Sequence, residues 1–349
     1  MIKVLIVDDS TFMRHWLVDV LANVEGIDVV GTAKNGLDAL KKIQTLNPDV
    51  VTLDVEMPIM DGLQTLEQIM QVCPLPVIML SSWTKEGATI TLEAMEKGAF
   101  DFIPKPEFGE DLDSWKKQFI AKIRMACEAN LHSLIKGQPQ TPTLPEKIRV
   151  SHSEKEKTIV VIGTSTGGPR ALEEVIGKLP AQFPAPVVVI QHMPPRFTGL
   201  LAERLNRLST LPVKEAEQGE ILQNGHVYIA PGGYHLQIEK KCGRLSSRLT
   251  LDPPLKGLRP AFDYLLQSLT NVTDYRKVVV FLTGMGSDGA SSLVELKKTG
   301  PVYTIAEAKE TAVIFGMPKA AIQTGYVDEV ARLERIADLI HKKVCLGWT

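Results

Sequence analysis

The sequence TIVVIGTSTGGPR, residues 158–170, contains an uninterrupted apolar run followed directly by small residues. Residues 159–162 show no polar alternation, which is typical of a strand covered on both faces of its sheet. Glycine and threonine then break the pattern, and Pro169 suits the first turn of a following helix. The stretch therefore predicts a buried strand, a tight turn and a helix, with Ser165 in the turn at the carboxyl end of the strand.

A serine in such a turn lies beside the free backbone N–H groups at the N-terminus of a helix. Those donors suit either of two partners, a phosphate group or the oxyanion of an acyl-transfer intermediate. This stretch alone leaves both possibilities open.

The composition is that of a globular protein. The 349 residues suffice for two domains, each with its own core, and the 44% hydrophobic and 23% charged content is ordinary. A net charge of -2 gives no support to a nucleic-acid partner or an anionic membrane surface. No apolar run approaches the roughly 20 residues that span a bilayer, so we expect no direct membrane insertion.

The cysteines and the N-terminus indicate the compartment. The four cysteines have no CxxC spacing, which argues against a disulfide framework and a zinc site. The opening sequence MIKVLIVDDS has too short an apolar run for a signal peptide and is typical of a first strand. We therefore expect a cytoplasmic protein with reduced thiols.

The first 125 residues alternate between apolar runs and helical segments. The strand-like runs fall at residues 2–7, 29–30, 50–53, 77–80 and 100–103. Five such units predict a parallel sheet with helices on both faces. Ligands of these sheets bind outside the carboxyl ends of the strands.

Polar side chains follow the ends of these strands. Asp8 and Asp9 follow the first strand and Asp54 the third. Charges of like sign about 4 Å apart cost roughly 4 kcal/mol, so three converging carboxylates need a cation, and oxygen ligands favour Mg²⁺. Ser81 and Lys105 complete the edge and suit a carboxylate that is phosphorylated. Each residue taken alone is more simply a solvated loop residue, but the coincidence at successive strand ends favours a site.

The motifs of this region resemble the receiver domain of two-component response regulators: Val7-Asp8-Asp9, Leu53-Asp54-Val55-Glu56-Met57-Pro58-x-x-Asp61-Gly62, Ser81-Ser82 and Lys105-Pro106. The resemblance implies a flavodoxin-like fold with a five-stranded parallel sheet, and phosphorylation of Asp54 by a histidine kinase. It implies Mg²⁺ held by Asp9 and Asp54, and by Asp8 through water. It makes the 105–106 bond a candidate cis peptide. It also assigns the sensing of the phosphoryl group to Ser81, Lys105 and Phe102.

A polar segment separates two domains. The residues that follow 135, KGQPQTPTLPEKIRVSHSEKEK, are polar and broken by three prolines, so they predict a semi-flexible tether. A last receiver helix is expected over residues 111–135. We therefore predict a receiver domain over residues 1–135, a linker over 136–157 and a second domain over 158–349.

The second domain is predicted to be doubly wound α/β with a mainly parallel sheet. Residues 186–191 and 277–283 are further buried strands, and residues 212–252 suggest a β-hairpin excursion. Three strand ends then present Ser165, His192 and Asp288 at one edge. A serine needs a base, and the base needs an orienting acid, to act as a nucleophile. The order Ser, His, Asp disfavours the α/β-hydrolase fold, in which the acid precedes the histidine.

Other interpretations of these residues stay open at this point. Ser165 also suits a phosphate loop, His192 a structural histidine with His226 and His235 as competitors, and Asp288 a helix cap. The loop at residues 284–289 has the spacing GxGxxG, and an acid, Glu307, follows about 20 residues later, which formally matches a dinucleotide-binding fingerprint.

Four motifs in order resemble the catalytic domain of the chemotaxis protein-glutamate methylesterases: Gly163-Thr-Ser165-Thr-Gly-Gly-Pro169, Gln191-His192-Met-Pro194, Ala230-Pro231-Gly232 and Leu282-Thr-Gly-Met285-Gly-x-Asp288-Gly289-Ala. This resemblance makes Ser165 the nucleophile, His192 the general base and then acid, and Asp288 the orienting carboxylate. The backbone N–H groups of Thr166 and Met285 would bind the oxyanion.

The two resemblances together imply a phosphorylation-regulated esterase. It would hydrolyse γ-glutamyl methyl esters on methyl-accepting chemotaxis receptors, release methanol and deamidate receptor glutamines. We expect a monomer that uses Mg²⁺ for phosphorylation and no cofactor for ester hydrolysis. The alternatives are a non-catalytic adaptor that binds receptors, or a dinucleotide-binding domain.

Overall fold

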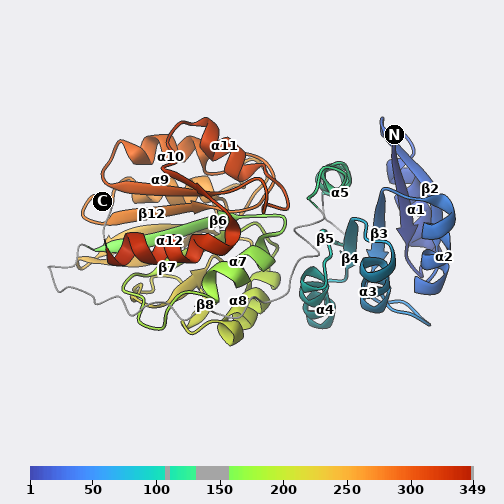
Figure 1. The fold of residues 1–349 in the computed structure, drawn as a ribbon, viewed down its shortest axis with the longest axis horizontal. Helices are drawn as coiled ribbons and strands as arrows, with labels where there is room; N and C mark the ends of the chain where they lie inside the picture. The colour runs from blue at the N-terminus through green and yellow to red at the C-terminus, as the bar shows by residue number, and fades with distance from the viewer. Residues whose placement is uncertain (107–110, 131–156, 347–349) are drawn as a thin grey trace. The chain divides into compact units, whose positions relative to one another are not determined.

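The computed structural model describes residues 1–106, 111–130 and 157–346. The chain divides into two compact units, Met1–Lys136 and Gly137–Thr349, which are drawn in Figure 1. Residues 136–156 of the predicted linker lie outside the described residues, so its boundaries stay a prediction. In the described part of the chain, no helix is both long and apolar enough to cross a membrane.

The first unit is a parallel sheet with the strand order β2-β1-β3-β4-β5. Its strands are β1 (Ile2–Val7), β2 (Ile27–Ala33), β3 (Val50–Asp54), β4 (Val77–Ser81) and β5 (Asp101–Pro104). Its helices are α1 (Thr11–Leu21), α2 (Gly36–Leu46), α3 (Gly62–Val72), α4 (Lys85–Glu96) and α5 (Leu112–Ala126). The predicted five-stranded parallel fold is confirmed, although α5 ends at Ala126, before the limit expected from the sequence.

Polar residues placed before the helices of this unit fix where those helices begin. The side chain of Ser10 accepts a bond from the N–H of Met13, and Asp61 forms a capping box with Gln64 at the start of α3. Each bond satisfies a backbone donor that the helix leaves free. The loops between strands and helices are therefore held in place, and with them the acids at the strand ends.

The second unit is a seven-stranded sheet in which every pairing is parallel, with a separate two-stranded ribbon. Its strands are β6 (Thr158–Thr164), β7 (Val187–Gln191), β8 (Val213–Glu215), β9 (Val227–Ile229), β10 (His235–Lys241), β11 (Arg244–Thr250), β12 (Arg276–Phe281), β13 (Val302–Glu307) and β14 (Glu329–Ala331). Its helices are α7 (Gly168–Ile176), α8 (Phe197–Leu208), α9 (Phe262–Leu269), α10 (Ala290–Lys297), α11 (Met317–Gln323) and α12 (Leu333–Cys345).

The order of strands in this sheet, β14-β13-β12-β6-β7-β9-β8, has a reversal between β12 and β6. The chain leaves β6 toward β7 on one side and later returns through β12 on the other. The loops after the two strands therefore diverge and open a crevice at the carboxyl edge, where ligands of such sheets bind. In the first unit the corresponding reversal lies between β1 and β3.

The expectation for residues 212–252 is half wrong. The hairpin exists as β10 and β11, which pair antiparallel. The short strands β8 and β9 are instead parallel members of the main sheet, because Val213 pairs with Val227 and Val187 with Val227 on the other side. At three residues each they are too short for their pairing partner to be evident from periodicity.

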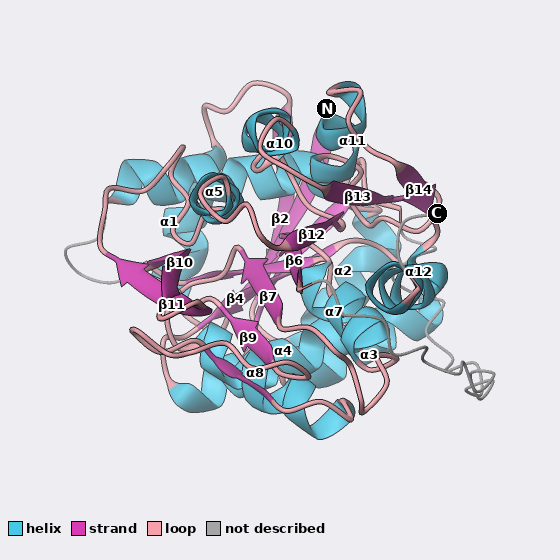
Figure 2. Ribbon diagram, turned by 90° about the vertical axis from the view of Figure 1, so that its left-hand side faces the viewer, coloured by secondary structure: helices cyan, strands magenta, loops and turns pink. Residues whose placement is uncertain are grey.

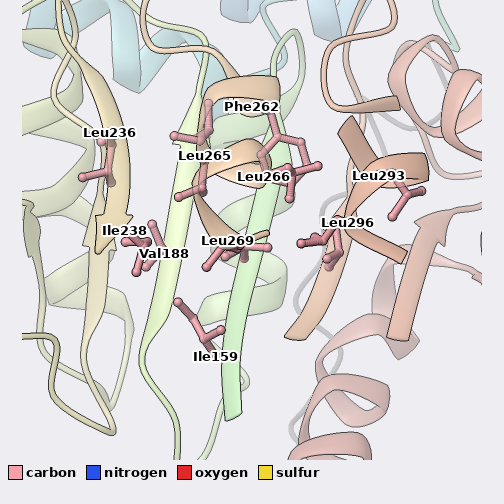
Figure 3. Close-up of a cluster of buried hydrophobic side chains, with 14 of the residues drawn as sticks. Ile159, Val188, Leu236, Ile238, Phe262, Leu265, Leu266, Leu269, Leu293 and Leu296 are labelled. Atoms are coloured by element: carbon pink, nitrogen blue, oxygen red, sulfur yellow. The ribbon is translucent and has the colours of Figure 1, made fainter. Parts of the chain in front are cut away.

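Helices cover both faces of the main sheet, as Figures 1 and 2 show, with α7, α8 and α12 on one face and α9 and α10 on the other. Helix α9 was not predicted from the sequence. Its apolar residues recur at positions i, i+3, i+4 and i+7, the helical period: Phe262, Leu265, Leu266 and Leu269. Figure 3 shows these side chains against Ile159 and Val188 of the sheet.

The core under α9 gives the first prediction. Leu265 is completely buried, so Leu265→Ala removes buried methyl groups and leaves a cavity. We expect the second unit to lose about 2–5 kcal/mol of unfolding free energy, measured by urea unfolding. Leu208→Ala removes the same atoms from a residue that is 49% exposed, and its expected cost is within about 0.5 kcal/mol. Equal losses in the two variants would contradict this account of the core.

Candidate active site and phosphoacceptor site

Ser165 lies one residue beyond β6, at the crevice between β6 and β12. Its N–H donates to the carbonyl of Thr283 (3.0 Å), and its own carbonyl accepts from the N–H of Gly168 (2.8 Å). The turn needs glycine at position 167, where φ is +78°. It also needs glycine at position 284, because a Cβ there would lie 2.8 Å from the Cβ of Ser165. The serine is half-buried at the open edge of the sheet.

His192 and Asp288 meet at the same edge. His192 follows β7, and its N–H donates to the carbonyl of Thr164 in the neighbouring strand (3.1 Å). Its ring nitrogen Nε2 is 2.7 Å from Oδ2 of Asp288, and both side chains are nearly buried. Asp288 lies in the loop between β12 and α10, on the opposite side of β6 from β7. The topology thus brings together three residues that are up to 123 positions apart in the sequence.

The N-terminus of α9 holds the Asp288 carboxylate. Oδ2 accepts from the N–H of Phe262 (2.5 Å) and Oδ1 from the N–H of Asp263 (2.9 Å). Burial alone would raise the pKa of Asp288, but the hydrogen bond and charge of His192 and these two N–H groups outweigh it and lower the pKa. Asp288 is therefore an ionised acceptor for the histidine ring.

The arrangement leaves Nδ1 of His192 as the ring nitrogen for a serine proton, since Asp288 occupies Nε2. Within residues 157–346, the Ser165 hydroxyl makes no hydrogen bond to that ring. Bonds of this kind are often long before substrate binds. Thr166 and Met285, named for the oxyanion, lie in the two loops that flank the serine. Thr166 is buried, and Met285 is 43% exposed.

The competing histidines have other positions. His226 precedes β9 and therefore lies at the amino end of a parallel strand, away from the crevice. His235 is fully buried, where its Nε2 contacts the carbonyl of Pro253 and its ring stacks on Tyr264 with centroids 3.9 Å apart. Burial lowers the pKa of His235. Both are thus accounted for as structural residues.

The GxGxxG loop is explained without a dinucleotide: Gly286 has a φ of +79°, and the other two glycines are required by packing. A Cβ at Gly284 would strike Ser165, and a Cβ at Gly289 would lie 2.4 Å from the ring of Phe262. Glu307, the acid that the fingerprint would place on a ribose, is completely buried, and its Oε2 accepts from the N–H of Thr283 (2.7 Å). It has no access to a bound sugar.

The receiver acids lie at the reversal between β1 and β3. Carboxylate oxygens of Asp8, Asp9 and Asp54 lie within 4.8 Å of one another. The ammonium of Lys105 is 2.9 Å from Oδ2 of Asp8 and 2.8 Å from Oδ2 of Asp54. Burial raises the pKa of Asp54 to about 6, although Lys105 opposes it. Among the described residues, the ligand atoms that converge here are carboxylate oxygens, so the donor set fits Mg²⁺.

The remaining predicted receiver residues flank this cluster. Ser81 ends β4 and is completely buried, and its hydroxyl accepts from that of Thr91 on α4 (2.7 Å). Phe102 lies in β5 and is also buried. The prediction that the 105–106 peptide bond is cis is wrong. In the described part of the chain, the cis peptide bond is Arg259–Pro260.

Two features of the catalytic edge were missed from the sequence. One is α9 as the support of Asp288, which the apolar period from Phe262 would have revealed. The other is the side chain of Gln191, which contacts the carbonyls of Ser165 and His192. A polar residue at the end of the apolar run PVVVIQ was a signal, but a run does not tell which way its last side chain points.

Comparisons with known proteins agree with the fold. Residues 160–340 match the family model of CheB methylesterase, and residues 4–114 match that of the response regulator receiver domain. Proteins named protein-glutamate methylesterase/protein-glutamine glutaminase are 51% identical in Geobacillus kaustophilus and 47% in Bacillus subtilis, in both cases over 97% of each chain. The crystal structure of the Thermotoga maritima CheB methylesterase catalytic domain is 45% identical, with a TM-score of 0.51, and covers 53% of this chain and 98% of that one.

The fold and the site define a response-regulator receiver joined to an α/β esterase domain. The chain belongs to the CheB methylesterase family. The family resemblance inferred from the motifs is confirmed, and so is the fold class.

Glu307 gives a prediction about pH and stability. Burial raises its pKa from 4.5 to about 7, so the folded protein binds more protons than the unfolded chain between these values. The stability that the protonated Glu307 contributes is fully present below the pKa of the unfolded chain and is lost as pH rises through about 7. Glu307→Gln keeps an acceptor for Thr283 and removes the ionisation. It should unfold like wild type at about pH 3.5, below the unfolded pKa, and be more stable by up to about 3 kcal/mol at about pH 8.5.

Calorimetric unfolding at the two pH values checks this, with Glu203→Gln, an exposed position on α8, as the matched control. A stability difference between Glu307→Gln and wild type that is independent of pH would contradict it.

Proposed function

We propose that this chain is a phosphorylation-regulated esterase that hydrolyses γ-methyl esters of glutamate on methyl-accepting chemotaxis receptors. The carrying observation is the hydrogen bond between His192 and Asp288, at the crevice where Ser165 ends a neighbouring strand. An ionised acid, an imidazole and a half-buried hydroxyl at one edge are the components of acyl transfer by a serine. The names of the relatives support the ester and the amide as substrates.

Acylation begins when His192 takes the proton of the Ser165 hydroxyl. The Ser165 oxygen bonds to the ester carbonyl carbon, and the carbonyl electrons move onto oxygen. The N–H groups of Thr166 and Met285 stabilise that oxyanion. When the carbonyl re-forms, the carbon–methoxy bond breaks, and His192 gives its proton to the leaving oxygen. The products of this half are methanol and a glutamyl ester of Ser165.

Deacylation runs the same steps with water. His192 takes a proton from water, the hydroxide oxygen bonds to the acyl carbon, and the bond to Ser165 breaks. His192 returns its proton to Ser165, and the released γ-carboxyl group ionises. Asp288 stabilises the imidazolium that forms in both halves. A glutamine side chain follows the same route, with ammonia in place of methanol.

The receiver unit supplies the control. Asp54 is the proposed phosphoacceptor: its carboxylate oxygen bonds to phosphorus as the bond from phosphorus to a histidine of the kinase breaks. Asp9 and Asp54 would hold Mg²⁺ directly and Asp8 through water, and the ion when bound neutralises charge on the transferring phosphoryl group. Lys105 already contacts Asp8 and Asp54 and is placed to donate a hydrogen bond to a phosphoryl oxygen, with Ser81 and Phe102 as the other proposed sensors.

The remaining parts of the proposal concern partners and place. We expect the protein to act in the cytoplasm as a monomer, with a chemotaxis histidine kinase and the receptors as its partners. A net charge of -2 supports no nucleic-acid partner. No group other than the side chains and backbone named above is required for ester hydrolysis in this mechanism.

Loss of the nucleophile gives the decisive prediction. Ser165→Ala should lower the turnover number for methanol release from methylated receptor membranes by at least about 10³-fold, since no other group replaces the attacking oxygen. Ser287→Ala, an exposed serine in the loop of Asp288, is the matched control and should keep wild-type turnover. Full release by Ser165→Ala would remove Ser165 as nucleophile, whereas no release by wild type would favour the non-catalytic adaptor.

Loss of the phosphoacceptor gives a separate prediction. A small-molecule phosphodonor with Mg²⁺ should raise methanol release by wild type, and Asp54→Asn should abolish that rise because the amide cannot form the acyl phosphate. Asp19→Asn changes an exposed acid of α1 and should respond as wild type does. If Asp54→Asn still responds to the phosphodonor, the proposed regulation is wrong, whatever the fate of the esterase.

A further inference from the structure

In each of the two peptide units that would bind the oxyanion, the carbonyl oxygen accepts hydrogen bonds on the side opposite to the N–H group. The N–H of Thr166 belongs to the peptide whose carbonyl is that of Ser165. This oxygen accepts two bonds, from the N–H of Gly168 (2.8 Å) and from Nε2 of Gln191 (3.0 Å). In a trans peptide the N–H and C=O groups point in opposite directions. Fixing the carbonyl on one side therefore aims the N–H to the other.

The second peptide has the same arrangement. The N–H of Met285 belongs to the peptide whose carbonyl is that of Gly284. This oxygen accepts from the N–H groups of Gly316 (3.1 Å) and Met317 (2.8 Å). A Cβ at Gly316 would lie 2.6 Å from the same oxygen, so the close approach requires glycine. A carbonyl that accepts hydrogen bonds also polarises its peptide, which strengthens the N–H as a donor.

Of the four donors just named, Gln191 is the side chain, and the other three are backbone groups. Its Nε2 also donates to the carbonyl of His192 (3.2 Å), so one amide ties together the loops of the nucleophile and the base. The residue is 2% exposed. Only the amino group of an amide can face two carbonyl oxygens, which fixes its orientation.

The surroundings of Gln191 leave this amide little freedom. A Cβ at Gly168 would lie 2.0 Å from Oε1 of Gln191, so the glycine at the start of α7 makes room for the amide. Oε1 is buried and, within residues 157–346, has no hydrogen-bond partner. A buried acceptor without a partner costs free energy. The favourable contribution of Gln191 at this position is therefore the two hydrogen bonds that Nε2 donates.

We propose that Gln191 is a positioning residue of the esterase, which aligns and polarises the Ser165–Thr166 peptide for the oxyanion and keeps His192 in register with Ser165. The inference rests on the proposed function of Ser165. Gln191 touches neither substrate nor reacting atoms, and acts through the backbone of residues that do. Because the oxyanion is absent from the bound substrate and forms only as the acyl carbon becomes tetrahedral, loss of Gln191 lowers turnover and leaves substrate binding unchanged.

The test uses the full-length protein with phosphodonor and Mg²⁺ on methylated receptor membranes. Gln191→Met keeps the size of the side chain and removes the donor. We expect kcat to fall about 10- to 100-fold, somewhat less than for a lost oxyanion donor, with KM within about twofold of wild type. Gln267→Met also removes an amide donor, whose acceptor is the hydroxyl of Ser292, and should match wild type.

Gln191→Glu adds a signature that a merely structural role does not give. An ionised carboxylate faces the two carbonyl oxygens with no proton to donate, whereas the protonated form has one. The deficit in kcat relative to wild type, measured at the same pH, should therefore shrink as pH falls for Gln191→Glu and stay constant for Gln191→Met. If thermal unfolding shows that Gln191→Met is not folded, the pH dependence of the kcat deficit in Gln191→Glu alone decides whether residue 191 acts as a donor.

Three results would overturn the inference: wild-type kcat in Gln191→Met, a loss confined to KM, or pH-independent deficits in both variants. Ser165→Ala is measured alongside. If that variant is inactive while Gln191→Met is fully active, the inference alone fails. If Ser165→Ala retains activity, the proposed function fails.

Discussion

The arrangement of the candidate active site at the carboxyl edge of the main sheet depends on the carboxylate of Asp288. It accepts from two N–H groups at the N-terminus of α9 and from the ring of His192, so one ionised group joins a helix, the loop after β12 and the loop after β7. The helix in turn is held against the sheet by its apolar face. Because a buried carboxylate is costly without partners, the acid, the helix and the histidine stabilise one another's positions.

In both units the same topological rule determines where the candidate functional residues lie. The strand order reverses between β1 and β3 in one sheet and between β12 and β6 in the other, and the polar residues lie in the loops that diverge there. The charges differ with the task. Three carboxylates and Lys105 suit a cation and a phosphoryl group, whereas Ser165, His192 and Asp288 carry at most one net negative charge at the site where an oxyanion would form.

The strands that are followed by candidate functional residues could be predicted from the sequence, because long apolar runs such as residues 159–162 are typical of buried parallel strands. The residue after each run then lies at the edge of the sheet. It missed what depends on distant pairing. The three-residue strands β8 and β9 carry no period of their own, and Gln191 was visible only as part of a motif. The direction of a side chain at a strand end follows from the neighbouring loops and not from the run itself: Gln191 contacts the carbonyl of Ser165, 26 positions away, and Thr164 contacts that of Thr283, 119 positions away.

The most direct measurement of the central claim is the site at which a fluorophosphonate, which reacts with activated serine hydroxyls, modifies the full-length protein. Peptide mass spectrometry maps the adduct after reaction with and without phosphodonor and Mg²⁺. The account predicts a single adduct, on Ser165, that forms faster when Asp54 is phosphorylated and is absent from Asp288→Asn on the same timescale. An adduct on another serine, or equal labelling of Ser165 in Asp288→Asn, would contradict it.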